Sequence, residues 1–370
     1  SYKYIYMAVF NYNNIKIAGI SCVIPKNVVK TNSYKDIFGD EEVEKFMEMT
    51  GITQTRRTEE FQTASDMATT AARHLLEKKN VDPSEIKALV FGTHSPDYKR
   101  PASAFVIQKQ LGISTEAAVF DISLGCSAAV YGLQVVASMM ANSDIDKAIL
   151  VVGDTAGKTT NPKDRASIML IGEASIAILL EKTTASVPMT SLMRSDGDGY
   201  RYLIVPAGGY RNLNTHREEE ICHDGNPRSL YNSFMQGTSV FTFTISDVPK
   251  SIKDYLQMTN TTVEDYDTFA FHQANLLILK QIAKKIKIPM EKLPITLSSY
   301  GNTSGASQVL TLCDAYGDTE GKDIKIMMIG FGVGISWGVT SFEINTSDIF
   351  PIIEDDTIFE EGIIQSVSEL

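Results

Sequence analysis

Residues 76–92, LEKKNVDPSEIKALVFG, and residues 256–272, LQMTNTTVEDYDTFAFH, are two versions of one pattern. Each contains a helix end, an asparagine, an acidic turn and a short apolar run typical of a buried strand. The two asparagines, Asn80 and Asn260, lie 180 positions apart. Because a pattern repeated at a fixed distance is the signature of duplicated units, the chain is predicted to contain two copies of one α/β unit.

Two further pairs of segments repeat in the same order. LGCSAAVYGL around Cys126 matches YGNTSGASQVL around Asn302, 176 positions later. DKAILVVGD from Asp146 matches DIKIMMIGF from Asp323, 177 positions later. Three matches in order at nearly one offset are hard to obtain by chance, and together they support the duplication.

Strands and helices alternate within each copy. Strand-length apolar runs such as KALVF and KIMMI alternate with amphipathic helical segments, which predicts mainly parallel sheets covered by helices. We therefore predict an α/β fold of two halves related by a pseudo-twofold axis, residues 1–185 and 186–370. The second half ends in an acidic tail after Asn345. Cys126 and Asn302 hold equivalent positions in the two halves, so their turns can converge on one site.

The composition limits the possible functions. A net charge of −11 argues against nucleic-acid binding, because such affinity comes mainly from basic residues. No apolar run reaches the roughly 18 residues of a membrane span, and the first residues do not resemble a signal peptide. The four cysteines show no metal-ligand spacing, which favours reduced thiols in the cytosol and predicts neither a metal nor another cofactor.

Cys126 is the candidate nucleophile. It follows a strand-like run and Gly125, and it precedes a small-residue helix, whose positive N-terminal end would favour the thiolate. For this segment alone, a buried structural cysteine is an equally good interpretation.

Two polar residues change the balance. His272 ends a strand, where α/β folds place their chemistry, and Asn302 can donate to an oxygen that gains negative charge. Separately, His272 could be a strand-end histidine and Asn302 an N-cap. Together with Cys126 they predict covalent acyl transfer.

These residues carry a resemblance to a known family. From about Ile15 to Ile344 the chain resembles the 3-oxoacyl-ACP synthase III family of the thiolase superfamily, of which it looks like an atypical member. The shared segments are DISLGC, PKDRASIMLIGEASIAILLE, MQGTSVF, FHQAN, YGNTSGAS and GFGVGISWG. The resemblance implies a duplicated thiolase-like fold with five layers, α-β-α-β-α. It also implies a cytoplasmic homodimer that condenses an acyl-CoA or acyl-ACP with malonyl-ACP, releasing CO2 and giving a 3-oxoacyl-ACP.

The resemblance also assigns roles to single residues. Cys126, His272 and Asn302 would be catalytic, and the backbone N–H groups of Cys126 and Val333 would hold the oxyanion. The remaining contacts implied along CoA and its pantetheine arm are those of Arg165, Asn275 and Gly237.

Lysines follow one face of the helix that begins after His272. Lys280, Lys284 and Lys285 lie opposite or beside an apolar stripe formed by Leu279, Ile282 and Ile286. A solvated helix face is the plain interpretation. On an acidic protein, and beside the expected tunnel mouth, a docking patch for acyl carrier protein is the favoured one.

The chain departs from the family pattern at four positions. Lys45 and Met49 stand where a tryptophan and an arginine usually sandwich the CoA adenine, and Leu277 replaces an arginine. Arg100 stands where the family's partner subunit contributes a phenylalanine to the tunnel. These departures favour an acyl donor that is carrier-bound, or one that is polar or acidic, over acetyl-CoA. An Arg100 that points to solvent is the alternative interpretation.

Three other functions stay open from the sequence. The same scaffold could transfer its acyl group to a hydroxyl or amine without decarboxylation. A papain-like hydrolase has the same Cys–His–Asn order, but this chain lacks that family's C-G-x-C-W neighbourhood. A non-catalytic partner subunit is disfavoured because all three polar residues are present. A polar stretch containing His216, Cys222 and His223 is interpreted as a lid or surface excursion rather than a metal site.

Overall fold

A pair of central helices lies between two β-sheets. The computed structural model, which describes residues 7–369, places α5 (Ala128–Ala141) and α9 (Ser307–Tyr316) in this middle layer. Their buried residues share one apolar core with strands of both sheets. The small side chains of α5, such as Ala128, Ala129 and Ala137, allow this close approach, because they are fully buried and require little space.

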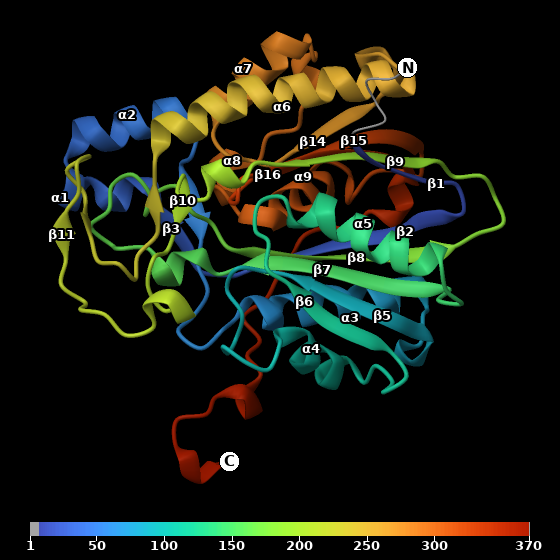
Figure 1. Cartoon of the computed structure of the whole chain (residues 1–370), viewed down its shortest axis with the longest axis horizontal. Helices are drawn as coiled ribbons and strands as arrows, with labels where there is room; N and C mark the ends of the chain where they lie inside the picture. The colour runs from blue at the N-terminus through green and yellow to red at the C-terminus, as the bar shows by residue number, and fades with distance from the viewer. Residues whose placement is uncertain (1–6, 370) are drawn as a thin grey trace.

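The outer faces of the two sheets are also covered by helices (Figure 1). Helices α3 (Ala64–Lys79) and α4 (Ser103–Leu111) cover one sheet, and α6 (Gly237–Thr259) and α7 (Leu276–Ile286) cover the other. The layers therefore follow the order α-β-α-β-α, as predicted.

The first sheet contains six described strands. Their order is β17 (Ile353–Glu354), β2 (Ile15–Ile24), β8 (Ala174–Lys182), β7 (Lys147–Asp154), β5 (Ile86–Gly92) and β6 (Ala118–Ile122). Strands β7, β5 and β6 run parallel, whereas β8 is antiparallel to both of its neighbours.

The second sheet contains five described strands. Their order is β1 (Ala8–Tyr12), β9 (Met189–Ser195), β16 (Ser336–Asn345), β15 (Asp323–Gly332) and β14 (Thr268–Phe271). Only β14 and β15 are parallel neighbours in this sheet. The prediction of mainly parallel sheets is wrong here, because a short turn at residues 333–335 joins β15 to β16 and such a turn can join only antiparallel strands.

The duplication is visible in the order of the strands. The series β2-β8-β7-β5 of the first sheet corresponds to β9-β16-β15-β14 of the second. Asn80 and Asn260 cap the C-termini of α3 and α6 in the same left-handed conformation, with φ of 51° and 53°. Each cap is followed by a short 3-10 turn with a capping box and then by the equivalent strand. The division at residues 185 and 186 remains a prediction.

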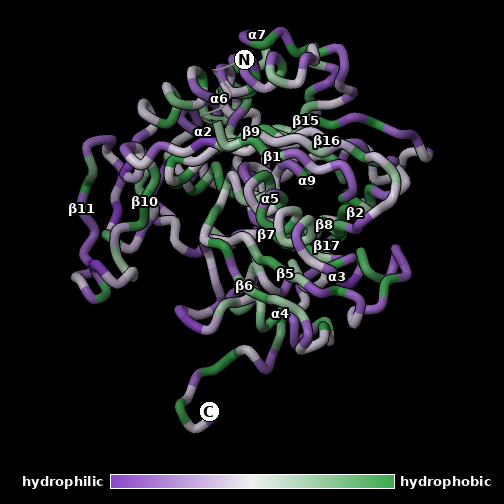
Figure 2. The backbone as a smooth tube through the Cα atoms, turned by 45° about the vertical axis from the view of Figure 1, so that its right-hand side comes forward, coloured by the Kyte–Doolittle hydropathy of each residue, from purple (hydrophilic) through white to green (hydrophobic). Residues whose placement is uncertain are grey.

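Shorter elements complete the chain. They are α1 (Lys35–Phe38), α2 (Asp40–Thr50), α8 (Leu297–Tyr300), β3 (Val28–Lys30), β4 (Gln54–Arg56), β10 (Leu203–Ile204), β11 (Glu220–Ile221), β12 (Pro227–Arg228) and β13 (Phe234–Met235). In Figure 2 the excursion that carries β11 is largely hydrophilic and lies at the periphery, away from the hydrophobic central strands.

The two ends of the described chain cross between the halves. Strand β1 pairs with β9 in the second sheet, and β17 pairs with β2 in the first. The tail is held further by an ion pair between Arg56 and Glu354, and the Tyr98 hydroxyl donates to the Gly362 carbonyl at 2.6 Å. The tail, whose role the sequence leaves open, therefore packs on the first half as far as Gly362, and its last residues extend from the body (Figure 1).

Candidate active site

Three turns meet beside the N-termini of the central helices. Cys126 lies between β6 and α5, His272 directly follows β14, and Asn302 lies between α8 and α9. All three contact Ser304. The Cys126 sulfur is 3.8 Å from the Ser304 hydroxyl, His272 Nδ1 is 3.1 Å from the Ser304 carbonyl oxygen, and the Ser304 N–H donates to Asn302 Oδ1 at 3.0 Å. The three residues expected to be catalytic are thus brought to one place.

Burial dominates the electrostatics of Cys126. It raises the pKa of the thiol from 9.0 to about 12, and the charge of Asp154 adds to the rise. Hydrogen bonding with Ser304 and with the backbone N–H groups of Cys126 and Val333 opposes it. A rise of this size corresponds to about 4 kcal/mol, whereas a helix N-terminus contributes at most about 2 kcal/mol. The resting residue is therefore a thiol, contrary to the expectation that the helix would favour the thiolate.

The two backbone N–H groups beside the sulfur are those expected to form the oxyanion hole. The Val333 N–H belongs to the turn between β15 and β16, and the preceding residue, Gly332, lies against Cys126. A Cβ added to Gly332 would lie 2.6 Å from the Cβ of Cys126, so any larger residue would displace the cysteine.

His272 is a buried, neutral imidazole. Its side chain packs edge-on against Phe331, with ring centroids 5.1 Å apart. Burial lowers the pKa of the ring from 6.5 to about 4, because the charged form loses solvation. Nδ1 lies 3.1 Å from the Ser304 carbonyl oxygen and 2.9 Å from the Ser307 hydroxyl. These contacts engage Nδ1, so Nε2 is the nitrogen that a reacting group would meet.

Asn302 is fixed by its backbone as well as by its side chain. Its N–H donates to the Leu170 carbonyl, and its own carbonyl accepts from the Gly172 N–H, both at 2.9 Å. Gly301 before it has φ of 65°, and an added Cβ would lie 2.8 Å from the Leu170 oxygen, so glycine is required there. Since Oδ1 accepts from Ser304, the amide NH2 of Asn302 is left to donate to a substrate.

Asp154 is a buried carboxylate that the sequence analysis missed. It ends β7, is 3% exposed and accepts from the Ser304 hydroxyl at 2.6 Å, from the His94 N–H at 2.7 Å and from the Thr93 hydroxyl at 3.1 Å. Its position at a strand C-terminus, like that of His272, is the signal that could have found it. The ring of His94 lies against Gly125, because a Cβ added to that glycine would lie 2.8 Å from Nδ1.

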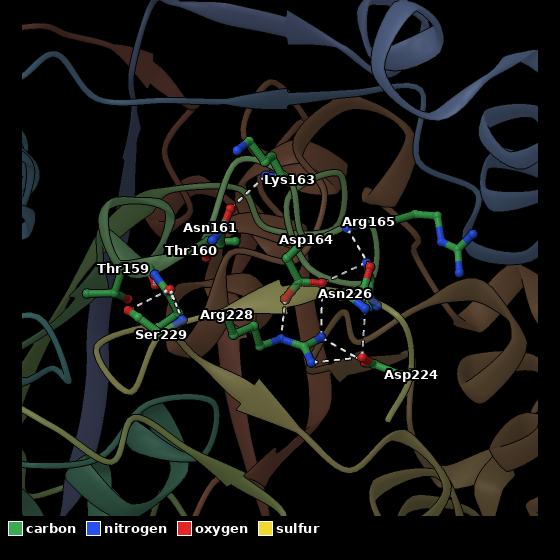
Figure 3. Close-up of polar contacts among 12 residues, drawn as sticks. Thr159, Thr160, Asn161, Lys163, Asp164, Arg165, Asp224, Asn226, Arg228 and Ser229 are labelled. Atoms are coloured by element: carbon green, nitrogen blue, oxygen red, sulfur yellow. Dashed lines mark hydrogen bonds and ion pairs between the residues drawn. The ribbon is translucent and has the colours of Figure 1, made fainter. Parts of the chain in front are cut away.

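Arg165 lies in a small cavity with the residues that depart from the family pattern. The cavity, of about 160 Å³, is lined by Lys45, Met49 and Arg165 among others. The Arg165 guanidinium is not free, because it forms an ion pair with Glu42 at 2.8 Å. Figure 3 shows this side chain directed away from the neighbouring polar cluster.

That cluster anchors the excursion of residues 208–232 (Figure 3). Arg228, which is 4% exposed, donates to Asp164 at 2.6 and 3.0 Å and to Asp224 at 2.9 and 3.1 Å. Asn226 accepts from the Arg165 N–H at 3.0 Å. The excursion is therefore fastened to the loop that carries Arg165. Nothing in the sequence distinguishes these charges from ordinary surface charges.

Three other predicted contact residues lie outside the Ser304 cluster. Asn275 caps α7, and its side chain accepts from the Ile278 N–H at 2.8 Å. Gly237 opens α6, with empty space where a Cβ would be. Arg100 is exposed in the loop before α4.

The lysines of α7 face outward. Lys280, Lys284 and Lys285 are exposed, and the Lys285 ammonium donates to the Ile245 carbonyl at 2.6 Å. The predicted apolar stripe of Leu279, Ile282 and Ile286 is buried against the second sheet, as expected.

Two features are absent from the described residues, 7–369. None of their helices combines the length and the apolar character that a membrane crossing needs. Nor do these residues contain a group of three or more His, Cys, Asp or Glu side chains placed to hold a metal ion. In the excursion, His216 is exposed and the ring of His223 packs on Phe234.

Comparison with known proteins shows which family this chain resembles. Residues 120–197 match the family described as 3-oxoacyl-[acyl-carrier-protein] synthase III, and residues 256–344 match its C-terminal part. The β-ketoacyl-[acyl-carrier-protein] synthase III of Caldanaerobacter subterraneus is 33% identical over 325 residues, which cover 87% of this chain and 95% of that protein. A putative 3-oxoacyl-[acyl-carrier-protein] synthase 3 of Campylobacter jejuni is 28% identical, over 92% of this chain and 96% of its own.

Solved structures give the same answer for the fold. The crystal structure of a 3-oxoacyl-(acyl-carrier-protein) synthase from Burkholderia xenovorans superposes with a TM-score of 0.88, at 30% identity. The superposition covers 94% of this chain and 99% of that one. The predicted duplicated thiolase-like fold is confirmed by this likeness.

Proposed function

The chain belongs to the 3-oxoacyl-[acyl-carrier-protein] synthase III family, and on this premise we propose that it condenses an acyl thioester with malonyl-ACP through an acyl-cysteine. The products are a 3-oxoacyl-ACP and CO2. The observation that carries the proposal is the meeting of Cys126, His272 and Asn302 at one residue, with two backbone N–H groups beside the sulfur.

In the first half-reaction Cys126 takes the acyl group. Because thiol and imidazole are both neutral at rest, the proton leaves sulfur only as the thioester is attacked, and it passes to Nε2 of His272. The N–H groups of Cys126 and Val333 receive the oxyanion, and a lost donor of this kind costs about 3–4 kcal/mol in similar sites. The bond between the donor's carbonyl and its sulfur then breaks, and the leaving thiol takes the proton from His272.

In the second half-reaction His272 acts as a donor. Between the half-reactions the ring proton exchanges through solvent from Nδ1 to Nε2. The Ser307 hydroxyl, 2.9 Å from Nδ1, then turns from the Ser304 carbonyl and donates to Nδ1. The Nε2–H and the Asn302 NH2 then donate to the thioester oxygen of malonyl-ACP as CO2 leaves. The carbanion attacks the acyl carbon, the bond to Cys126 breaks, and the sulfur takes one proton from solvent.

Acyl carrier protein docks, in this proposal, on the exposed lysines of α7. Lys280, Lys284 and Lys285 lie on the helix that starts four residues after His272, so a carrier bound there would be close to the reacting thioester. An acidic surface on the carrier would complement these lysines, because complementary charge speeds the encounter of two proteins.

A second copy of the chain is proposed to pair along β6. This strand ends the first sheet, so one of its edges has no strand partner in the described residues. Asp121 of β6 accepts the N–H groups of Ser103 and Ala104, which fixes the loop containing Arg100 at the same edge. A twofold axis at β6 would therefore bring Arg100 close to the partner subunit, consistent with its expected place at the partner's tunnel.

Two measurements test the proposed reaction. Purified protein is incubated with malonyl-ACP labelled at its free carboxyl group and with acyl-ACP or acyl-CoA donors; labelled CO2 and the intact protein mass are measured. We expect an acyl mass on the wild type, none on Cys126→Ala, and CO2 release that falls at least 100-fold in Asn302→Ala. An acylated protein that releases no CO2 would instead support acyl transfer to a hydroxyl or amine.

A further inference from the structure

One residue contacts the whole candidate site through separate atoms. The Ser304 N–H donates to Asn302, its carbonyl oxygen lies 3.1 Å from His272 Nδ1, and its hydroxyl lies between Asp154 and the Cys126 sulfur. Resting on the proposed function, we infer that Ser304 is a positioning residue with two separable roles. Its backbone orients the decarboxylating pair, His272 and Asn302, and its hydroxyl, held by Asp154, controls how readily Cys126 reacts.

The backbone of Ser304 is in an unusual conformation. Its φ is +53°, in the left-handed region that side chains other than glycine rarely adopt. The following residue, Gly305, fixes the turn by close approach, because a Cβ added to it would lie 2.3 Å from the Gly125 carbonyl oxygen. A non-glycine residue kept in this region at a reactive centre suggests that its side chain is used there.

The side chain of Ser304 has one proton to give. The Asp154 oxygen, 2.6 Å away, is a charged and close acceptor, and the sulfur is a weak one at 3.8 Å. The proton therefore goes to Asp154, and the hydroxyl oxygen faces the thiol as an acceptor. The charge of Asp154 therefore helps to keep the unreacted sulfur protonated until a thioester arrives, and the Ser304 hydroxyl lies between this charge and the sulfur.

Three titratable groups lie close to the residues that adjoin Cys126, and they come from three different elements. Asp154 ends β7, His272 follows β14 and His94 follows β5, with its ring against Gly125. The two hydrogen-bonding distances limit the separation of the Asp154 carboxylate from the Cys126 sulfur to about 6.4 Å. At that distance a unit charge changes a thiolate equilibrium by roughly ten- to a hundredfold in a partly buried site.

Replacing Asp154 by asparagine removes the charge and also reverses one hydrogen bond. The His94 N–H can only donate, so the asparagine oxygen must face it, and the new NH2 faces Ser304. The Ser304 hydroxyl then accepts from the amide and turns its own proton to the sulfur. Asp154→Asn should therefore make Cys126 more reactive. Ser304→Ala should make it less reactive, because the Asp154 carboxylate then faces the sulfur with no hydroxyl between them.

The test measures alkylation of Cys126 by iodoacetamide against pH. It uses full-length protein carrying Cys222→Ser, because Cys22 and Cys313 are buried and Cys222 is not. At pH 7 we expect Asp154→Asn to react roughly 10- to 100-fold faster than the parent and Ser304→Ala roughly tenfold slower. Ser304→Gly is the matched control: glycine adopts the positive φ without strain, so an equal loss in both variants assigns the effect to the hydroxyl.

A second readout tests the backbone role. Decarboxylation of malonyl-ACP without an acyl donor needs His272 and Asn302 but no acyl-cysteine. We expect Gly305→Ala, which pushes the turn away from Gly125, to slow this decarboxylation by roughly 100-fold or more relative to the parent while its circular dichroism stays unchanged.

The outcomes separate this inference from the proposed function. Alkylation rates of Asp154→Asn and Ser304→Ala that move in the same direction, or stay within twofold of the parent, overturn the role of the hydroxyl. If folded Gly305→Ala decarboxylates malonyl-ACP at the rate of the parent, the Ser304 backbone does not orient His272 and Asn302. If alkylation shifts as expected but the wild type releases no CO2, the proposed reaction fails and the control of Cys126 by Ser304 and Asp154 stands.

Discussion

Replacing Arg228 with methionine should detach the excursion of residues 208–232 from the enzyme body. Methionine has a similar volume but no charge, so the substitution leaves Asp164 and Asp224 facing each other. Asp164 is almost fully buried, with a side chain only 1% exposed. Arg228 supplies two of its hydrogen bonds, at 2.6 and 3.0 Å, beside one from the Ala166 N–H. A buried charge that loses its partner in this way destabilises a protein by about 3–5 kcal/mol.

The structure supplies a control for this variant. Lys163 and Glu219 also connect the 159–165 loop to the excursion, but their side chains are 69% and 46% exposed and 3.9 Å apart. An exposed pair of this kind is worth at most about 1 kcal/mol. Lys163→Met therefore removes a positive charge from the same loop with little expected loss.

Two measurements follow the effect of Arg228→Met. Urea unfolding gives the global free energy, and limited proteolysis with mass mapping shows whether cleavage begins within residues 208–232. We expect rapid cleavage in the excursion and a lower unfolding midpoint for Arg228→Met, and neither for Lys163→Met. Equal midpoints and equal cleavage rates for the two variants would refute the view that the buried network holds the excursion.

Three further predictions concern pH, docking and assembly. Since the folded-state pKa of His272 is about 4, below its ordinary 6.5, its contribution to stability is present above pH 6.5 and is lost as pH falls to 4. In this pH window the free energy of unfolding of the wild type, measured with urea, should therefore fall by about 3 kcal/mol more than that of His272→Gln. Parallel curves of unfolding free energy against pH for the two proteins would contradict the assignment. Reversing the charges of Lys280 and Lys284 to glutamate should raise KM for malonyl-ACP roughly tenfold and leave KM for a small malonyl thioester unchanged; equal changes would place the carrier elsewhere. Ala118→Lys puts a charge on the exposed start of β6 and should give the mass of a monomer in light scattering with unaltered circular dichroism, whereas an unchanged dimer would exclude pairing along this strand.

The duplication could be predicted from sequence because it rests on local chemistry. Asn80 and Asn260 end helices in a conformation that asparagine tolerates. The repeated residues therefore determine the conformation of their own backbone, which can be predicted from local sequence. Cys126, His272 and Asn302 could be found because each follows a strand or a glycine turn of recognisable form. Their convergence on Ser304, however, depends on a contact across the two halves.

The charges of the site and of the excursion were not predictable in the same way. The pKa of Cys126 is set by how much water the fold excludes, and burial outweighs the helix N-terminus that the sequence reveals. Asp154, Asp164 and Arg228 are ordinary charged residues in the sequence. Their partners lie 150, 64 and 4 positions away, and only the three-dimensional structure identifies them. The antiparallel hairpin of β15 and β16 was also missed, because their apolar runs are compatible with either direction.

The crossed chain ends have a consequence for how the protein is made. Strand β17 borders β2 in the first sheet, yet the ribosome releases β17 only after every strand of the second sheet. Strand β1 must likewise wait for β9. Neither sheet can be completed by its own half during synthesis, so long-range pairing comes late and cooperatively, as expected for a topology rich in contacts distant in sequence. The enzyme should therefore resist division into two separately expressed halves, despite its duplicated architecture.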